Sequence, residues 1–209
     1  MSDIEFDDDG SERIKVILVG NAWVGKTNLI RVSTGKAFEE NSAVTLNVSF
    51  LTKKMKIDDK YFNLYLWDTV GSEKLRAMTN LFYKNSKIVI FVYDITDENS
   101  FNDLNVWVKD VKSQIGDNFV KGVVGNKNDL FVNEKVNEIV AEKYAKSINA
   151  KFRTTSAKNE PKGLEIFLEE LLREYINNKE KYINNDIPKN NIKIKKNGVK
   201  EKKKCCLSK

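Results

Sequence analysis

The sequence predicts an α/β domain whose six-stranded, mostly parallel sheet has one antiparallel edge strand and helices on both faces. Short apolar runs alternate along the chain with segments whose apolar residues recur at helical spacing. Two neighbouring runs are instead joined by a short polar turn, as in a hairpin. Because alternating strands and helices form parallel sheets through right-handed crossovers, only the hairpin should supply an antiparallel strand.

Six apolar runs, rich in β-branched and aromatic residues, predict the strands. They are Arg13 to Val19, about Val48 to Ile57, Tyr61 to Trp67, Ile88 to Tyr93, Val120 to Val124 and Lys151 to Thr154. The polar pair Asp58–Asp59 separates the second run from the third, so these two should form the hairpin.

Helical patterns fill the intervals between the other strands. Lys26 to Val32 follows a glycine-bearing turn, and the last helix should begin near Pro161. The expected buried faces comprise Phe101, Leu104, Val108 and Val111; then Ile139, Val140, Tyr144 and Ile148; and finally Leu164, Phe167, Leu168, Leu171, Leu172, Tyr175 and Ile176.

Length and charge predict one domain with two tails. A chain of 209 residues can bury an adequate core as a single domain without disulfides. We expect an acidic flexible arm over residues 1–12, the domain over 13–177 and a flexible basic tail over 178–209. The tail holds 11 lysines against three acidic residues, a net charge of +8, which leaves −2 of the total +6 for the rest. The basic partner surface is therefore the tail.

The apolar segments and the cysteines limit the compartment. No segment approaches the roughly 20 consecutive apolar residues of a membrane span, and the acidic N-terminus does not resemble a signal peptide. Cys205 and Cys206 are adjacent near the end of the chain, which excludes a disulfide framework and fits a reducing cytosol.

One motif predicts a P-loop nucleotide-binding domain. Gly20-Asn21-Ala22-Trp23-Val24-Gly25-Lys26-Thr27 matches G-x-x-x-x-G-K-[ST] between a predicted strand and a predicted helix, where a chance match is uncommon. The residues from Asn21 to Thr27 should enclose the phosphates with their N–H groups. Lys26 can contact the β- and γ-phosphates, and the Thr27 hydroxyl can ligate magnesium.

Three further motifs indicate whether the domain binds a guanine or an adenine nucleotide, and whether it is a switch protein or a kinase. In Trp67-Asp68-Thr69-Val70-Gly71, Asp68 can reach magnesium through water and the Gly71 N–H can contact the γ-phosphate. In Asn126-Lys127-Asn128-Asp129, Asp129 can accept the paired N–H donors of guanine, which adenine lacks. In Ser156-Ala157-Lys158, a backbone N–H can meet the guanine oxygen. Each motif alone is also an ordinary polar turn, so their joint order carries the argument.

Taken together, these motifs resemble the Ras-like small GTPases over Arg13 to about Tyr175. The finer features are similar to the Rab branch, namely Thr45 to Phe50, Lys74 to Thr79, Phe82 to Lys84 and Phe91 to Thr96. The resemblance implies GTP and GDP as nucleotides with Mg²⁺, and loops near Thr45 and Gly71 that change order with the γ-phosphate. It also implies that Thr45 binds magnesium and the γ-phosphate, and that Phe38 packs on the guanine; an ordinary core or surface phenylalanine is the alternative.

Ser72 departs from the family, because most relatives carry there a glutamine that orients the attacking water. Serine is too short for that role, so we expect slow intrinsic hydrolysis with nucleotide binding retained. By resemblance, a GTPase-activating protein could supply the missing group in trans. The alternative is a GTP-bound scaffold with negligible hydrolysis. Trp23 is a second departure, and its bulk should point outward.

The end of the chain, Cys205-Cys206-Leu207-Ser208-Lys209, resembles a doubly geranylgeranylated Rab tail. Its last four residues can also be read as a C-a-a-X box with an unusual final lysine. Two lipids anchor stably where one anchors only marginally, and each nearby lysine adds about 1 kcal/mol on an anionic leaflet. Without the cysteines, the lysines would indicate a solvated tail or loose nucleic-acid contact.

The resemblance also implies partners and a location. An exchange factor, a GTPase-activating protein, effectors and a prenyl-Rab chaperone are expected, with a monomeric domain and no nucleic-acid partner. The protein should act in vesicle traffic on the cytoplasmic face of an intracellular membrane, with a cytosolic pool. A P-loop phosphotransferase acting on a small substrate is the rival, which both the Asn126 to Asp129 motif and the tail argue against.

Overall fold

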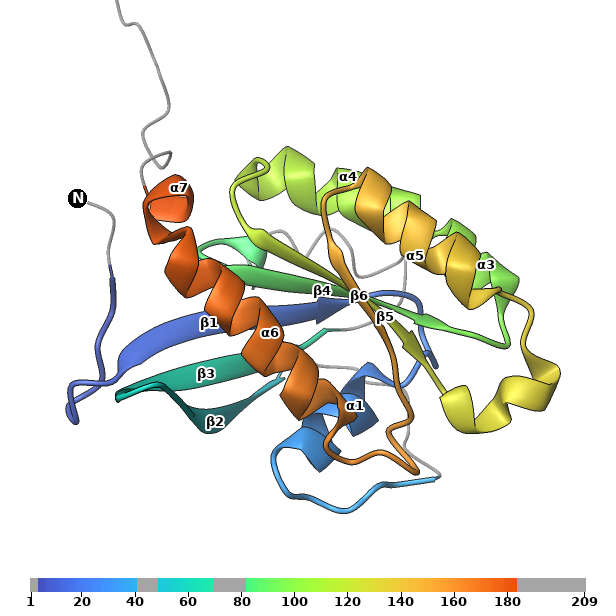
Figure 1. Cartoon of the computed structure of the whole chain (residues 1–209), viewed down its shortest axis with the longest axis horizontal. Coiled ribbons are helices and arrows are strands. Elements are labelled where there is room, and N and C mark those ends of the chain that lie inside the picture. The colour runs from blue at the N-terminus through green and yellow to red at the C-terminus, as the bar shows by residue number, and fades with distance from the viewer. Residues whose placement is uncertain (1–3, 41–48, 70–81, 184–209) are drawn as a thin grey trace, which may run out of the picture.

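The computed structural model describes residues 4–40, 49–69 and 82–183 (Figure 1). Five residues to which the sequence assigns a function lie outside these ranges: Thr45, Gly71, Ser72, Cys205 and Cys206.

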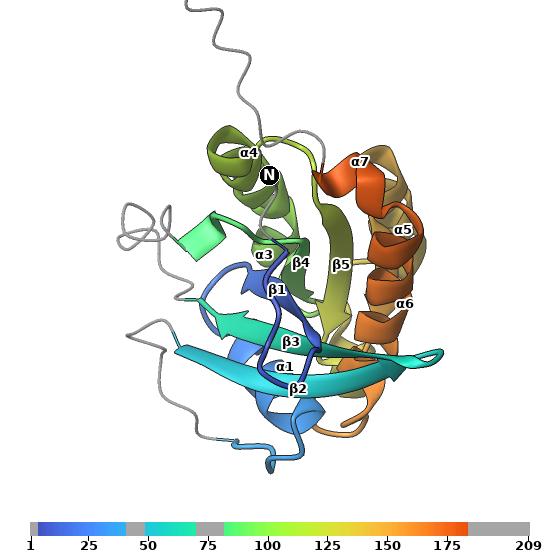
Figure 2. The same cartoon turned by 90° about the vertical axis from the view of Figure 1, so that its left-hand side faces the viewer.

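The described chain forms a six-stranded sheet in the order β2-β3-β1-β4-β5-β6. Strand β2 pairs antiparallel with β3 at one edge, and the other neighbours are parallel (Figure 2). The predicted sheet is therefore confirmed. The strands are β1 (Glu12–Val19), β2 (Ser49–Ile57), β3 (Lys60–Asp68), β4 (Ile88–Asp94), β5 (Val120–Asn126) and β6 (Lys151–Thr154).

Helices cover both faces of the sheet, as predicted. Alternate residues of β1 point to opposite faces, so Val16 and Leu18 enter one core cluster while Ile17 and Val19 enter the other. On the first face lie α1 (Lys26–Ser33), α6 (Gly163–Asn177) and α7 (Lys179–Ile183); on the second lie α3 (Glu98–Asn102), α4 (Leu104–Ile115) and α5 (Glu138–Ser147), with the 3₁₀ helix η2 (Asn128–Asn133) after β5.

The buried face of α5 differs from the prediction. Ile139 and Val140 are 61% and 53% exposed, whereas Ala141 and Ala145 are fully buried. Small alanine side chains let the helix approach the sheet closely, and their four-residue spacing places them on one face. The predicted Tyr144 and Ile148 do pack against this cluster. The prediction gave more weight to the large aliphatic residues than to alanine, and it therefore placed part of the buried face at the wrong edge of the helix.

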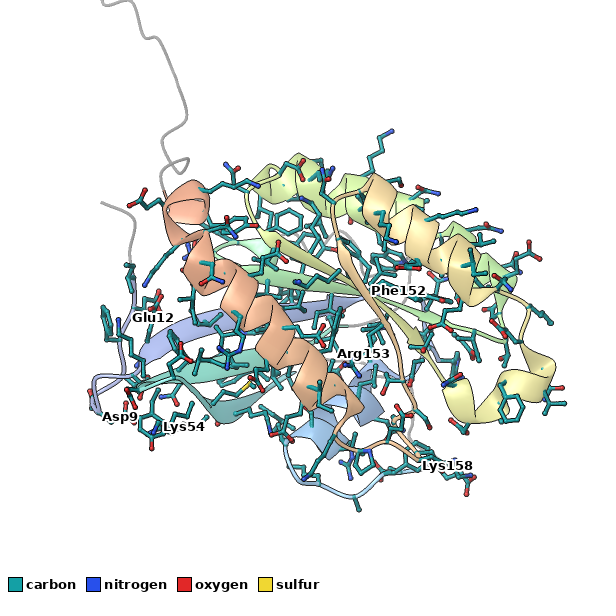
Figure 3. The ribbon with its side chains drawn as sticks, in the orientation of Figure 1. Asp9, Glu12, Lys54, Phe152, Arg153 and Lys158 are labelled. Carbon is teal, nitrogen blue, oxygen red and sulfur yellow. The ribbon has the colours of Figure 1, made fainter. Side chains whose placement is uncertain are left out.

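The N-terminal arm is held on the sheet, contrary to the expectation of a solvated arm up to residue 12. The Asp7 carboxylate accepts hydrogen bonds from Arg13, Asn63 and Tyr65. Asp9 Oδ2 lies 2.7 Å from Lys54 Nζ, and Figure 3 labels the two residues at one end of the molecule. That hydrogen bond is the main cause that lowers the pKa of Asp9 to about 2. Hydrophobic periodicity does not register such charge pairing with distant strands.

The chain also remains packed beyond residue 177, so the predicted start of the tail was placed too early. The ring of Tyr182, in α7, is buried and stacks on Tyr175 with ring centroids 6.1 Å apart. Lys179 Nζ donates to Glu12 Oε2 at 2.6 Å and thereby ties α7 to β1. Within the part of the chain that the structure describes, no helix has the length and apolarity needed to cross a membrane.

Candidate nucleotide site

The predicted phosphate loop joins β1 to α1, and two of its glycines are required by close contacts. A Cβ on Gly20 would lie 2.1 Å from the carbonyl oxygen of Val92. Gly25 has φ of +93°, and a Cβ there would lie 2.3 Å from Nδ2 of Asn126. A side chain at Gly20 would therefore displace the backbone of Val92, and one at Gly25 would displace the side chain of Asn126.

Lys26 is buried against this loop. Its Nζ donates to the carbonyl oxygens of Gly20 and Asn21 at 2.8 and 2.7 Å. Burial lowers the pKa of Lys26 to about 8, with Asp68 acting in the opposite direction. Helix α1 starts beside it with no side-chain cap and no acidic residue in its first turn. A buried ammonium next to an uncapped helix N-terminus fits a phosphate group.

The two described side chains that are predicted to bind magnesium lie next to each other. Thr27 Oγ1 donates to Asp68 Oδ2 at 2.7 Å. Asp68 is buried at the end of β3, directly opposite Leu18 of β1 in the parallel register. Mg²⁺ prefers such hard oxygen ligands, usually one or two side chains completed by phosphate oxygens and water. The oxygens of Thr27 and Asp68 therefore fit the ion, and the action of Asp68 through water stays a prediction.

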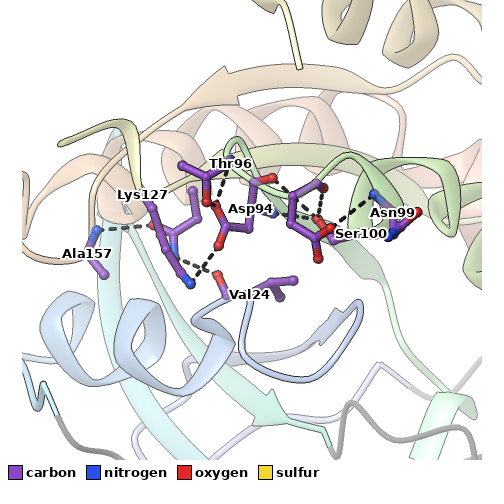
Figure 4. A network of polar contacts seen from close by, with 9 residues as sticks. Val24, Asp94, Thr96, Asn99, Ser100, Lys127 and Ala157 are labelled. Carbon is purple, nitrogen blue, oxygen red and sulfur yellow. Dashed lines mark hydrogen bonds and ion pairs between the residues drawn. The ribbon is translucent and has the colours of Figure 1, made fainter. Parts of the chain in front are cut away.

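Asn126 joins the phosphate loop to the base side. Its Nδ2 donates to the Val24 carbonyl at 2.8 Å, and its Oδ1 accepts from the Ala157 N–H at 3.2 Å. Figure 4 shows these bonds between three segments that are distant in sequence. The sequence pattern identified Asn126 as a nucleotide residue, whereas the structure shows a buried amide that holds the loops together.

The two base motifs meet at Asp129. Ser156 Oγ donates to its Oδ1, and the Lys158 and Asn159 N–H groups donate to Ser156 Oγ at 3.2 and 3.0 Å. The Asn128 N–H also donates to the Thr155 carbonyl at 3.1 Å. The half-buried carboxylate is therefore oriented by the loop after β6. An acceptor held in this way can discriminate between base edges.

The Phe38 segment lies close to the base loops. Phe38 is half-buried and packs against the core beside α1. Asn28 exchanges two hydrogen bonds with the backbone of Glu39, at 2.9 and 3.0 Å. Lys158 Nζ lies 2.9 Å from Glu40 Oε1, in the loop labelled in Figure 3. These contacts bring Phe38 into the region of the base, and its packing on guanine stays a prediction.

The loop side chains point in different directions. Trp23 is 67% exposed, as its bulk led us to expect. The Asn21 side chain instead donates to Asp103 Oδ2 at 2.6 Å and accepts from Trp107 Nε1 at 2.8 Å. Asp103 and Trp107 fasten the loop to α4, and no motif in the sequence marked them.

The assembled site lies outside the carboxyl ends of β1, β3, β5 and β6, which supply the phosphate loop, Asp68, Asn126 to Asp129 and the Ser156 loop. In open α/β sheets, ligands bind outside the carboxyl ends of the strands. They bind where the connections that leave neighbouring strands run to opposite faces of the sheet. The described residues of the four motifs therefore lie at the same edge of the sheet.

Comparisons with known proteins agree with this geometry. The Ras family model matches residues 15–177. Ras-related protein Rab-21 of Homo sapiens is 42% identical over 155 residues, which cover 74% of this chain and 69% of that protein. Rab-21 of Geodia cydonium is 40% identical over 157 residues, covering 75% and 69%. Ras-related protein Rab-22A of Homo sapiens is 38% identical over 156 residues, covering 75% and 80%. The chain therefore belongs to the Ras family and is a small GTPase of the Rab type.

Proposed function

We propose that this Rab-type switch of vesicle traffic binds GTP and GDP with Mg²⁺ in the described site, hydrolyses GTP slowly by itself and acts from a membrane. The observation that supports the site is the joining of the phosphate loop to both base loops by the Asn126 side chain. A single amide thus links phosphate contacts to base contacts, so one nucleotide spanning both ends would satisfy the whole arrangement.

At the phosphate end, the residues provide positive charge and oriented donors. Lys26 supplies a buried cation, and the N–H groups at the start of α1 supply donors. Thr27 and Asp68 would hold magnesium, which when bound neutralises charge on the β- and γ-phosphates. By family resemblance, Thr45 and Gly71 would contact the γ-phosphate. Phosphoryl transfer depends mainly on such positioning and charge stabilisation.

At the base end, Asp129 would accept the two N–H donors of guanine, the Ala157 loop would face its oxygen, and Phe38 and Lys127 would complete the site. Adenine would leave the carboxylate without donors, so GDP should compete about 10⁴-fold better than ADP against a fluorescent GDP probe. Equal competition would contradict the guanine site and support the phosphotransferase alternative.

Hydrolysis tests the role of Ser72. Single-turnover hydrolysis of preloaded GTP with magnesium should be much slower in the wild type than in Ser72→Gln, because serine cannot reach the water that glutamine orients. Similar rates in both would show that another group orients the water. A wild type that binds GTP but shows no measurable turnover, even with a Rab GTPase-activating protein, would support the scaffold alternative.

Membrane attachment would use both Cys205 and Cys206. Two prenyl groups and the lysine-rich tail together would bind an anionic cytoplasmic leaflet, while a prenyl-Rab chaperone would maintain a cytosolic pool. Exchange factor, activating protein and effectors would act on a monomeric domain. In a prenylation reaction followed by mass measurement, the wild type should gain two lipids, Cys205→Ser and Cys206→Ser one each, and the double variant none.

A further inference from the structure

One buried carboxylate beside the base loops has no role in the function described above. Asp94 ends β4 and is 7% exposed. Its Oδ1 accepts from the Thr96 N–H at 2.8 Å and from Thr96 Oγ1 at 2.7 Å. The Asp94 N–H donates to Ser100 Oγ at 3.0 Å. One face of the carboxylate is thus fixed by its own loop, as Figure 4 shows.

The other oxygen faces the guanine-recognition motif. Asp94 Oδ2 lies 2.6 Å from Nζ of Lys127, and the side chains are 10% and 33% exposed. The pairing follows from the sheet, because Asp94 is opposite Asn126 in the β4–β5 register and Lys127 is the next residue. A partly buried pair of this kind is screened less by water than a surface pair.

Lys127 is a residue whose conformation needs such support. Its backbone is left-handed, with φ of 67° and ψ of 35°, which is costly for a residue other than glycine. Its long side chain would otherwise sample many rotamers. Lys127 also lies between Asn126, which braces the loops, and Asp129, which faces the base, so its orientation bears on both.

We propose that Asp94 is a positioning residue of the guanine site and acts through Lys127. The carboxylate holds the ammonium on the β4 side, so the Lys127 side chain is already oriented when the nucleotide binds. Without this pair, Lys127 would have to be ordered by the nucleotide itself, and the nucleotide would dissociate faster. The inference rests on the proposed guanine site and gives a role to Asp94, which the sequence marked only as part of the Rab-like segment Phe91 to Thr96.

The test is a double-mutant cycle on the full chain. The dissociation rate of fluorescent GDP with magnesium is measured for the wild type, Asp94→Asn, Lys127→Met and the double variant. Asparagine preserves the size and an acceptor for Thr96 but removes the charge. We expect Asp94→Asn to accelerate dissociation about 5- to 30-fold in the wild type and to have no further effect in Lys127→Met. Thr96→Val, which alters only the other carboxylate oxygen, should change the rate less than about twofold.

The comparison between the two backgrounds separates this role from a structural one. A positioning role predicts that Asp94→Asn accelerates dissociation only where Lys127 is present, whereas a structural role predicts the same acceleration in Lys127→Met. Equal acceleration by Asp94→Asn in both backgrounds, or none in either, would overturn the proposal. Should Asp94→Asn not fold, Asp94→Glu, which keeps the charge but displaces it, gives the same comparison. A wild type that fails to retain GDP would instead refute the guanine site itself.

Discussion

At the proposed phosphate end of the site, consecutive residues from Gly20 to Thr27 form the loop that would surround the anion, whereas at the proposed base end three segments distant in sequence are joined by side chains. The first arrangement depends on backbone shape and one buried lysine. The second depends on Asn126, Ser156 and the Asp94–Lys127 pair. We therefore propose that residues adjacent in the sequence provide the phosphate affinity, whereas base selectivity depends on how β4, β5 and β6 are ordered in the sheet.

The largest effect is expected at Lys26. Lys26→Ala removes the buried cation and should weaken GDP and GTP binding about 30- to several-thousand-fold, the cost of truncating one partner of a buried charge pair. Equilibrium titration with fluorescent GDP measures it. Lys36→Ala removes an exposed lysine nearby and should leave the affinity unchanged. Similar losses in both variants would mean that overall charge, not the loop, binds the phosphates.

Asn126→Ala should disturb both the phosphate loop and the base loops of the site. The substitution leaves the Val24 carbonyl and the Ala157 N–H without their partner, and each such buried group costs about 1–3 kcal/mol. The free energy of unfolding in urea should fall by about 2–6 kcal/mol, and GDP should dissociate faster. Asn133→Ala, on the exposed side of η2, is the control. A loss of phosphate binding or of base binding alone would show that Asn126 does not join the two ends of the site.

Asp129→Ala should remove base selectivity while keeping much of the phosphate affinity. Inosine diphosphate lacks the 2-amino donor of GDP, and one hydrogen bond to a charged acceptor is worth about 10- to 150-fold. The wild type should show that preference in competition titrations, and Asp129→Ala should show none. Lys26→Ala should weaken both nucleotides equally and keep the ratio. A changed ratio in Lys26→Ala would show that the two ends are coupled.

Two neighbours in the phosphate loop should respond differently. Gly25→Ala introduces a side chain at φ of +93° and 2.3 Å from Asn126 Nδ2, which should cost about 1–3 kcal/mol of unfolding free energy. Trp23→Ala removes a ring that is 67% exposed and should change GDP affinity less than about twofold. Thermal unfolding measures the effect of Gly25→Ala, and GDP titration measures the effect of Trp23→Ala. A large loss of affinity in Trp23→Ala would show that the ring contacts the nucleotide.

Sequence patterns predicted the strands closely, since β6 has the predicted bounds and four of the other five begin and end within one residue of them. They also predicted the phosphate loop, because a strand, a glycine turn and a helix start are encoded by adjacent residues. The errors have a common cause. The buried face of α5 and the packing of the Asp7 segment and of α7 depend on contacts with strands remote in sequence, which hydrophobic periodicity does not report.

The family follows from the amino-acid sequence alone, as do the predictions for the phosphate and guanine motifs and for Ser72, Cys205 and Cys206. The bracing of the loops by Asn126, the orientation of Asp129 by Ser156 and the pairing of Asp94 with Lys127 appear only in the folded chain. The physical reason is that a backbone loop is specified by neighbouring residues, whereas a side-chain hydrogen bond forms between whichever residues the strand order and register bring within about 3 Å.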